Sequence, residues 1–263
     1  GGITTRLVEF SQAFMGHMRG GLAQVNILSS ILFAGLSGSA VADTSALGST
    51  LIPAMEKYGY TCKFAAAITA ASSVIGPIIP PSGIMIIYAY VMGESVAALF
   101  MAGIVPGILV GIGLMVMVRL MADRYDLPKA ERIVHKNQII TKVEHNLSLL
   151  LVRINLMGLL WAVFRLTSSF AGVAMPHGWI LVCTLAVLLV FAHFFFMWLR
   201  TVVSADFRIV CKKGAVPLQT PIIILGGILV GVMTPTEAST VAVAYALLVS
   251  IFVLRSLTWA DFF

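Results

Sequence analysis

The feature that most constrains this chain is a set of apolar runs that are too long for one membrane helix and are broken by small polar residues. Residues 20–55 carry one charged side chain, Asp43, although about 20 residues already cross a bilayer. In the middle lies Gly35–Ala40, which reads GLSGSA. Its glycines and serines weaken a helix and offer oxygen atoms instead. The run predicts two half-length helices joined at membrane depth, a re-entrant hairpin. The alternative is one long tilted helix with a Gly/Ser packing face.

The composition places the whole chain in a membrane. Residues of the AVILMFWYC class make up 59% of the 263 residues, and charged residues make up 11%. A soluble domain carries about 25% charged residues, so this chain has too few to cover a surface in water. That excludes a soluble enzyme, a disordered tail and a nucleic-acid module. We interpret the net charge of +6 as the excess of lysine and arginine in the cytoplasmic loops of a membrane protein. No metal, redox or nucleotide motif is present, and we expect no enzyme.

Two further runs are broken in the same way. Residues 64–93 have no charge, and prolines at Gly76-Pro77 and Pro80-Pro81-Ser82 interrupt their centre. Prolines free upstream carbonyls, which lipid cannot satisfy, so we expect a discontinuous span that lines protein or a cavity. A surface loop between two short helices is the alternative. Residues 214–254 contain one charge, Glu237, beside the hydroxyl-rich segment 231–237. Paired interrupted hairpins are typical of inverted-repeat transporters.

The predicted fold is an all-α integral membrane protein with this inverted-repeat plan. The expected organisation is an amphipathic arm helix at 1–20, a first re-entrant hairpin at 21–62, a discontinuous helix with the following span at 63–121, a basic cytoplasmic loop at 122–146, two extra spans at 147–207, a second arm with a re-entrant hairpin at 208–256, and the start of a next segment at 257–263.

Four segments resemble one family in detail. They are GLAQVNILSSILFAGLSGSAVADTSALGS (21–49), IGPIIPPSGIMIIYA (75–89), PIIILGGILVGVMTPTEASTVAVAYALLV (221–249) and LTWADF (257–262). The chain is similar to part of the large, M-type permease subunit of TRAP (tripartite ATP-independent periplasmic) transporters, the DctM-like proteins. The resemblance covers about 1–133 and 208–263. We expect residues 134–207 to lie outside it, as an insertion, a piece like the small subunit or a join between two sequences.

The resemblance implies a permease subunit of a sodium-coupled secondary importer of organic acids, of the C4-dicarboxylate or sialic-acid type. It implies an elevator-type movement, a bacterial inner-membrane location, a small Q-type membrane subunit and a periplasmic substrate-binding protein of the P type. Two or more sodium ions would be transported with the substrate. The alternatives are a sodium/dicarboxylate symporter that needs no binding protein, and an assembly subunit without transport of its own.

Sodium is a hard cation that favours oxygen ligands, and the broken segments offer them. The candidate sodium ligands are Ser37, Gly38, Ser39, Gly76, Pro77 and Ile79 at one site, and Gly231, Thr234 and Thr236 at a second. The candidate substrate-binding residues are Asn26, Ser37, Ser39, Asp43, Ser82 and Thr236.

The two carboxylates in these runs, Asp43 and Glu237, each have two interpretations. In the first interpretation the carboxylate balances the charge of a bound cation. In the second it caps the start of a half-helix, and this one is favoured for Glu237. Outside the hairpins, Arg153 is expected to extend toward the membrane surface and His193 to be an ordinary satisfied polar residue.

Overall fold

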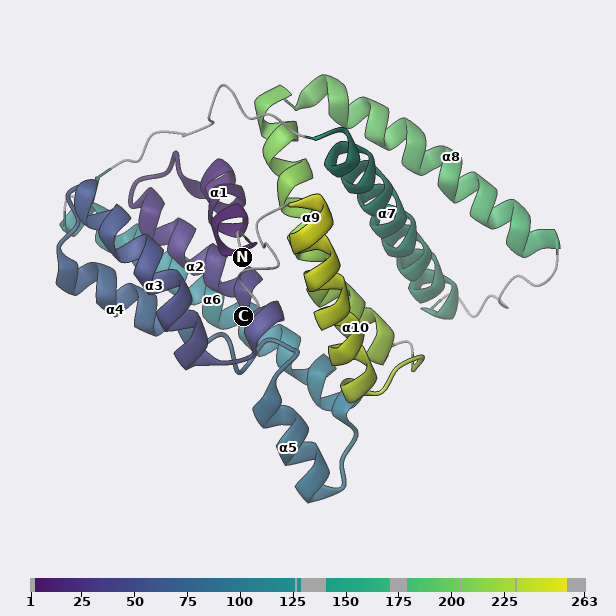
Figure 1. Cartoon of the computed structure of the whole chain (residues 1–263), viewed down its shortest axis with the longest axis horizontal. Coiled ribbons are helices and arrows are strands. Elements are labelled where there is room, and N and C mark those ends of the chain that lie inside the picture. The colour runs from purple at the N-terminus through teal and green to yellow at the C-terminus, as the bar shows by residue number, and fades with distance from the viewer. Residues whose placement is uncertain are drawn as a thin grey trace. The chain divides into compact units, whose positions relative to one another are not determined.

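The computed structural model describes residues 3–125, 127–128, 141–170, 179–203, 205–229 and 231–254. Within these residues all regular structure is helical (Figure 1). The chain divides into two compact units, one of residues 1–134 with 217–263 and the other of residues 135–216. The predicted all-α class is therefore confirmed.

The first unit begins with an arm and a helical hairpin. Helix α1 (Ile3–Met15) packs against α2 (Gly21–Ser37), and α2 packs in turn against α3 (Ala40–Lys57). The chain turns between α2 and α3 at Gly38 and Ser39. The run 20–55 thus forms two helices, as predicted, and not one long helix.

The predicted interruption of the run 64–93 is also present, and that its two halves form one membrane span remains a prediction. Helix α4 (Cys62–Ser73) ends before the prolines and α5 (Gly83–Met92) begins after them. The segment between them, residues 74–82, is called the proline break below. It contains a cis peptide bond between Pro80 and Pro81, and Ile75 and Ser82 within it are fully buried. The break therefore lies inside the protein, and the surface-loop alternative is wrong.

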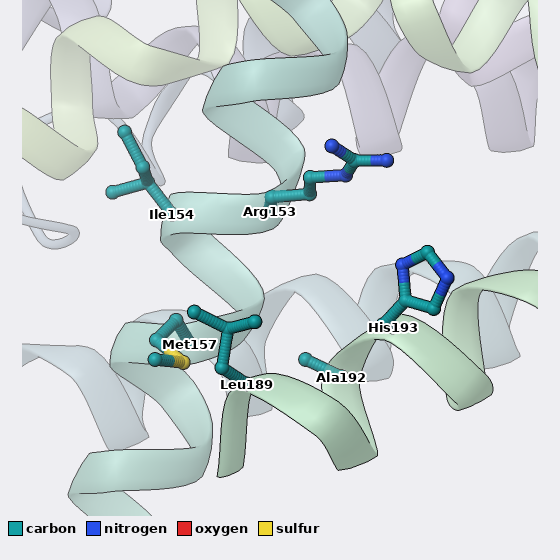
Figure 2. A pocket seen from close by; sticks show the side chains of 6 residues that line it. All are labelled: Arg153, Ile154, Met157, Leu189, Ala192 and His193. Atoms are coloured by element: carbon teal, nitrogen blue, oxygen red, sulfur yellow. The ribbon is translucent and has the colours of Figure 1, made fainter. Parts of the chain in front are cut away.

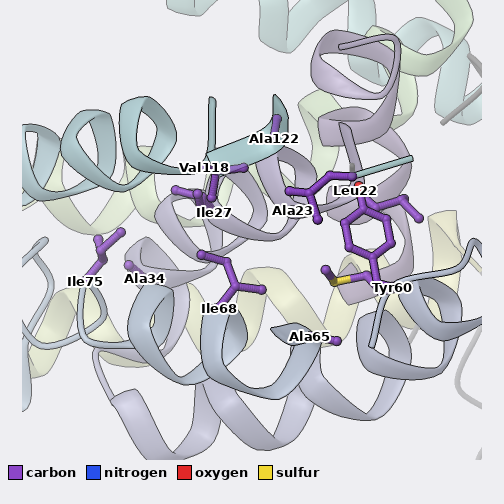
Figure 3. Close-up of a cluster of buried hydrophobic side chains, with 12 residues drawn as sticks. Leu22, Ala23, Ile27, Ala34, Tyr60, Ala65, Ile68, Ile75, Val118 and Ala122 are labelled. Carbon is purple, nitrogen blue, oxygen red and sulfur yellow. The ribbon is translucent and has the colours of Figure 1, made fainter. Parts of the chain in front are cut away.

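One apolar cluster joins the helices of this unit (Figure 3). Helix α6 (Val96–Arg124) lies against α2, and α4 lies against both α2 and α3. The buried members of the cluster are Leu22, Ala23, Ile27, Ala34, Met55, Tyr60, Ala65, Ile68, Ile75, Val118, Ala122 and Leu127. Four of them are alanines, and such small residues let helix backbones approach closely as they do in membrane proteins.

Buried hydroxyl and amide groups join α2 to α4 beside this cluster. The Asn26 amide nitrogen donates to Thr69 Oγ1 at 2.7 Å, and the Ser72 hydroxyl donates to Asn26 Oδ1 at 3.2 Å. The Ser30 hydroxyl donates to Ser72 Oγ at 2.9 Å. These four residues, the polar seam, are fully buried. Because buried polar groups are costly without partners, the seam favours one register of α2 on α4.

A second helical hairpin completes the first unit. It consists of α9 (Ala205–Leu229) from Pro217 onward and α10 (Pro235–Leu248), which continues as a π-helical turn, Val249–Val253. Ile224, Ile228, Ala238 and Ala242 of this hairpin form a buried cluster with Phe100 of α6. The hairpin is thus anchored to α6.

The second unit contains α7 (Lys142–Phe170), α8 (Trp179–Val202) and the first part of α9. Helices α7 and α8 pack along each other. They correspond to the two spans predicted at 147–207. Helix α6 continues to Arg124 and α7 begins at Lys142, so the two helices take up both ends of the predicted loop at 122–146. Residues 129–140 of this loop and the segment 257–263 lie outside the described residues.

Four stretches of the described chain are long and apolar enough to cross a membrane: Val96–Arg124, Val143–Leu160, Phe207–Leu229 and Pro235–Val253. Helix α2 is a shorter apolar helix of 17 residues. Both helices of the second hairpin are thus long enough to cross a membrane. Neither α2 nor α3 of the first hairpin is among the four stretches. That the hairpins turn back within the membrane remains a prediction.

Candidate functional site

The turn of the first hairpin, Ser37-Gly38-Ser39, is called the first tip. Gly38 has φ 59°, a left-handed conformation that glycine adopts without strain, and its N–H donates to the Ala34 carbonyl at 3.1 Å. Ser39 is the N-cap of α3, and its hydroxyl accepts from the Ala42 N–H at 3.4 Å. The residue types of SGS thus end one helix and start the next.

Asp43 lies one turn into α3 and is fully buried. Its Oδ1 accepts a hydrogen bond from the Ser37 hydroxyl. Its Oδ2 is buried and has no hydrogen-bond partner among the described residues. Ser39 is the N-cap residue, and Asp43 is the acidic residue in the first turn of α3, where a negative charge stabilises the helix start. Its unpaired buried oxygen also suits a cation or a proton, so both interpretations of Asp43 remain predictions.

The proline break lies against the first tip. A Cβ atom added to Gly76 would lie 2.6 Å from Asp43 Oδ2 and 3.2 Å from the Ser39 carbonyl carbon. A Cβ atom added to Gly38 would collide with the Pro81 carbonyl and lie 3.2 Å from the Ser82 Cα. The structure therefore brings the first tip and Asp43 together with Gly76 and Ser82.

The break also presents backbone oxygens. Its N–H groups donate to the carbonyls of Ser72, Ser73 and Ile75. In the part of the chain that the structure describes, no recorded hydrogen bond ends on the carbonyls of Gly76, Pro77 or Ile79. Ser82 is the N-cap of α5, and its hydroxyl accepts from the Met85 N–H at 3.3 Å. The predicted carbonyl ligands are therefore not engaged in helix bonds.

The second tip, residues 231–237, is bonded within itself. The Thr234 hydroxyl accepts from the Glu237 N–H at 3.3 Å, and the Thr234 N–H donates to Glu237 Oε2 at 2.8 Å. This is a capping box at the start of α10, as favoured for Glu237. Gly231 has φ 78°, and the Thr234 and Thr236 hydroxyl oxygens lie 3.1 Å apart. The recorded hydrogen bonds of these residues stay within their own hairpin.

Asn26 is not placed to meet a substrate at the first tip. Its amide is engaged with Thr69 and Ser72 in the polar seam. It is fully buried, and it precedes the tip by three helical turns. The sequence pattern could not separate a buried seam residue from a substrate ligand, because both are polar residues in an apolar helix.

A cavity of about 510 Å³ lies between the first tip and the second hairpin. Ser37, Pro81 and Gly83 line one side, and Thr220 and Ser239 line the other. Thr220 is 6% exposed, and its hydroxyl has no partner among the described residues. Sequence reasoning missed Thr220 and Ser239. The available signal was the polar pair Gln219-Thr220 directly before Pro221 in an apolar run.

The site offers oxygen atoms as ligands for a cation. The described residues hold no group of three His, Cys, Asp or Glu side chains suited to a transition metal. Hydroxyls, backbone carbonyls and one carboxylate meet at the first tip instead. That set matches a hard monovalent cation that must also be released.

Comparisons with known proteins show which family the chain resembles. The chain is 32% identical to the sialic acid TRAP transporter permease SiaT of Haemophilus influenzae over 263 residues, all of this chain and 32% of that protein. It is 33% identical to the large permease SiaM of Vibrio cholerae, over 99% of this chain and 45% of that protein. It is 32% identical to the C4-dicarboxylate large permease DctM of Pseudomonas aeruginosa, over the same two shares. The chain spans less than half the length of these relatives.

A family model described as "Tripartite ATP-independent periplasmic transporter, DctM component" matches residues 1–175 and 168–263. The match includes residues 134–207, so our expectation that these lie outside the resemblance was wrong. The sequence alone did not connect these residues with the family, because none of the four quoted motifs lies within them. The family is one of transporter components and not of enzymes, and the described spans are those of a multi-pass membrane protein. The chain belongs to the DctM component family of the tripartite ATP-independent periplasmic transporters.

Proposed function

We propose that this chain forms part of the transport domain of a sodium-coupled importer of organic acids. The ion site is the first tip together with Asp43 and the carbonyls of Gly76, Pro77 and Ile79. The observation that carries the proposal is the buried Asp43 Oδ2, which lacks a partner among the described residues and faces Gly76 at the meeting of two broken segments. A sodium ion bound there would supply the missing charge, while the Ser37 and Ser39 hydroxyls complete its shell.

The organic acid would occupy the cavity beside Ser37. Pro81 and Gly83, on either side of the N-cap Ser82, line the cavity at the start of α5, and the N–H groups of a helix start favour a carboxylate. Thr220 and Ser239 add hydroxyls from the second hairpin. An ionised Asp43 repels an anion, so its contribution to substrate binding acts through the sodium ion between them. Binding of substrate and sodium is then mutually dependent.

The relatives support the substrate class. Their names specify sialic acid and C4-dicarboxylate, both of which carry carboxylates at neutral pH. The family name supports assembly with a periplasmic binding protein, and the term "large permease" supports a small membrane subunit beside this one. We extend these properties to the present protein, with an inner-membrane location and an elevator-type movement of the first unit.

The second predicted ion site remains a separate hypothesis. The Thr234 and Thr236 hydroxyls lie close together, and Gly231 turns the backbone beside them. However, Thr234 already serves the capping box with Glu237. A sodium ion at the second tip would have to coexist with that cap.

The test is uptake into proteoliposomes that contain the full-length permease with its small membrane subunit. Sialic acid and succinate are supplied with and without the binding protein, in sodium and in potassium. The variants are Ser37→Ala and Asp43→Asn. Ser49→Ala is the matched control, because the Ser49 hydroxyl is exposed on the same helix as Asp43 and bonds only to the Ala46 carbonyl.

The proposal is supported if uptake needs both sodium and the binding protein. Uptake should also fall at least roughly tenfold in Ser37→Ala and in Asp43→Asn, because loss of one charge-assisted hydrogen bond has about this effect. Ser49→Ala should transport like the wild type. Sodium-driven uptake without the binding protein would identify the simple symporter. Uptake in potassium equal to uptake in sodium would overturn the ion site.

A further inference from the structure

A separate cavity lies in the second unit between α7 and α8 (Figure 2). Its volume is about 380 Å³. Its lining residues are Arg153, Ile154, Met157, Leu189, Ala192 and His193. Figure 2 shows Arg153 on α7 and His193 on α8 at the same end of the cavity, with the apolar residues toward the other end. The cavity is therefore amphipathic, with nitrogen donors at one end only.

Arg153 carries a positive charge within an apolar span. It lies in the stretch Val143–Leu160, and the described residues offer it no acidic partner. His193 contacts the ring of Phe194 edge-on, with ring centroids 6.2 Å apart. A cation in such surroundings is costly unless an anion accompanies it. The described residues thus supply no counter-charge to Arg153, which like His193 is exposed, and an anionic ligand at this place would supply one.

The depth of the two residues suits a lipid headgroup. Arg153 lies seven positions from Asn146, and His193 lies seven positions from Arg200. At a rise of 1.5 Å per residue, each lies about 10 Å inside the polar end of its helix. An extended arginine side chain covers most of that depth and meets a headgroup near the interface. Lys142 and Lys212 lie at this end together with one acidic residue, Glu144, so we assign it to the cytoplasm by the positive-inside rule. Anionic lipids are abundant in that leaflet.

The surroundings of the cavity are apolar and open. Leu150, Ile154, Leu189, Val190 and Phe194 are each more than half exposed. The Arg153 guanidinium and the His193 imidazole beside such a surface complement one phosphate followed by a hydrocarbon chain. A short organic acid would leave the apolar end of the cavity unfilled. We propose that this cavity binds the phosphate group of an anionic phospholipid, with Arg153 and His193 as its ligands and the groove between α7 and α8 holding the acyl chain.

The experiment is native mass spectrometry of the purified full-length permease complex, titrated in detergent with phosphatidylglycerol or phosphatidylcholine. The variants are Arg153→Gln, His193→Gln and Arg153→Lys. The matched control is Arg165→Gln, which removes the same charge from the same helix about 18 Å further along. Unfolding temperatures in lipid-free detergent are measured for all of them.

We expect Arg153→Gln to retain phosphatidylglycerol roughly fivefold less, the factor that corresponds to one basic residue near a membrane surface. Phosphatidylcholine retention and Arg165→Gln should be unchanged, and Arg153→Lys should regain most of the binding. Equal retention of phosphatidylglycerol by Arg153→Gln and Arg165→Gln would overturn the site. Displacement of the lipid by sialic acid or succinate would identify a carboxylate site instead. If Arg153→Gln unfolds at a lower temperature, failure of Arg153→Lys to restore lipid binding refutes the proposal.

Discussion

At the scale of the residue, Gly76 shows how closely the two broken segments approach each other. Its missing side chain leaves room for the Asp43 carboxylate and for the carbonyl carbon of Ser39. Gly226, by contrast, has open space where a Cβ would stand. The two glycines are alike in the sequence, since each lies in an apolar run, and they differ only in their tertiary surroundings.

Gly76→Ala is therefore expected to lower the unfolding temperature, because overpacking of a tight site costs about 1–3 kcal/mol. It should also raise the sodium concentration needed for half-maximal uptake, since the added methyl group displaces the Asp43 carboxylate. Gly226→Ala is the matched control and should leave both values unchanged. Thermal unfolding in detergent and sodium titration of uptake measure them. Unchanged values for Gly76→Ala would show that the break and the tip do not meet as described.

At the scale of the element, the structure distinguishes polar groups that support a helix from those that are free to bind. The Thr234 and Glu237 pair forms a cap at the start of α10, and the polar seam fixes α2 on α4. Asp43 and Thr220 differ from these, since each has a buried oxygen without a hydrogen-bond partner in the described chain.

Thr234→Ala removes the N-cap hydroxyl of α10 and should destabilise the protein by about 1 kcal/mol. If Thr234 serves only as a cap, the sodium dependence of uptake stays as in the wild type. Thr240→Ala is the control, because that hydroxyl bonds only to the Thr236 carbonyl one turn earlier in the same helix. A rise in the sodium concentration for half-maximal uptake in Thr234→Ala alone would instead support an ion at the second tip.

Asn26→Ala leaves Thr69 and Ser72 without their buried partner and should cost about 1–3 kcal/mol in unfolding free energy. The substrate concentration for half-maximal uptake should not change, because Asn26 is engaged in the seam. Melting curves and substrate titrations of the full-length complex test both statements. A variant with normal stability and weakened substrate binding would restore the substrate role expected from the sequence.

At the scale of the whole molecule, the described helices expose long apolar surfaces. On α6, Val105, Leu109, Val116 and Leu120 are each more than half exposed. At the start of α4, Cys62 is exposed and lies near Glu56, Lys57 and Lys63 in the chain. These surfaces suit a chain whose neighbours are lipid and further membrane helices, with the base of the first hairpin in water.

Cysteine labelling tests this placement in membrane vesicles. In a background without other cysteines, Cys62 should react with a water-soluble maleimide. Leu109→Cys and Val116→Cys should react poorly with that reagent, and they should react with an apolar maleimide where lipid faces them. The physical reason is that charged reagents do not enter the hydrocarbon core. Fast labelling of Leu109→Cys by the water-soluble reagent would contradict the placement of α6.

The sequence by itself determined the membrane class, the helical breaks and the family. These depend on local chemistry: charge is missing over long runs, glycine and proline interrupt helices wherever they occur in this way, and motifs such as GLSGSA and GPIIPPS are continuous in the chain. The capping role favoured for Glu237 was also local, because its partner Thr234 lies three residues away.

Only the tertiary structure decided which polar residues meet. Asn26 and Asp43 look alike in the sequence, each a polar residue in an apolar run. Asn26 finds Thr69 and Ser72 on α4, while Asp43 Oδ2 lies against Gly76 with no partner in the described chain. Such pairings join residues more than thirty positions apart. They depend on how the helices pack, which local pattern does not specify.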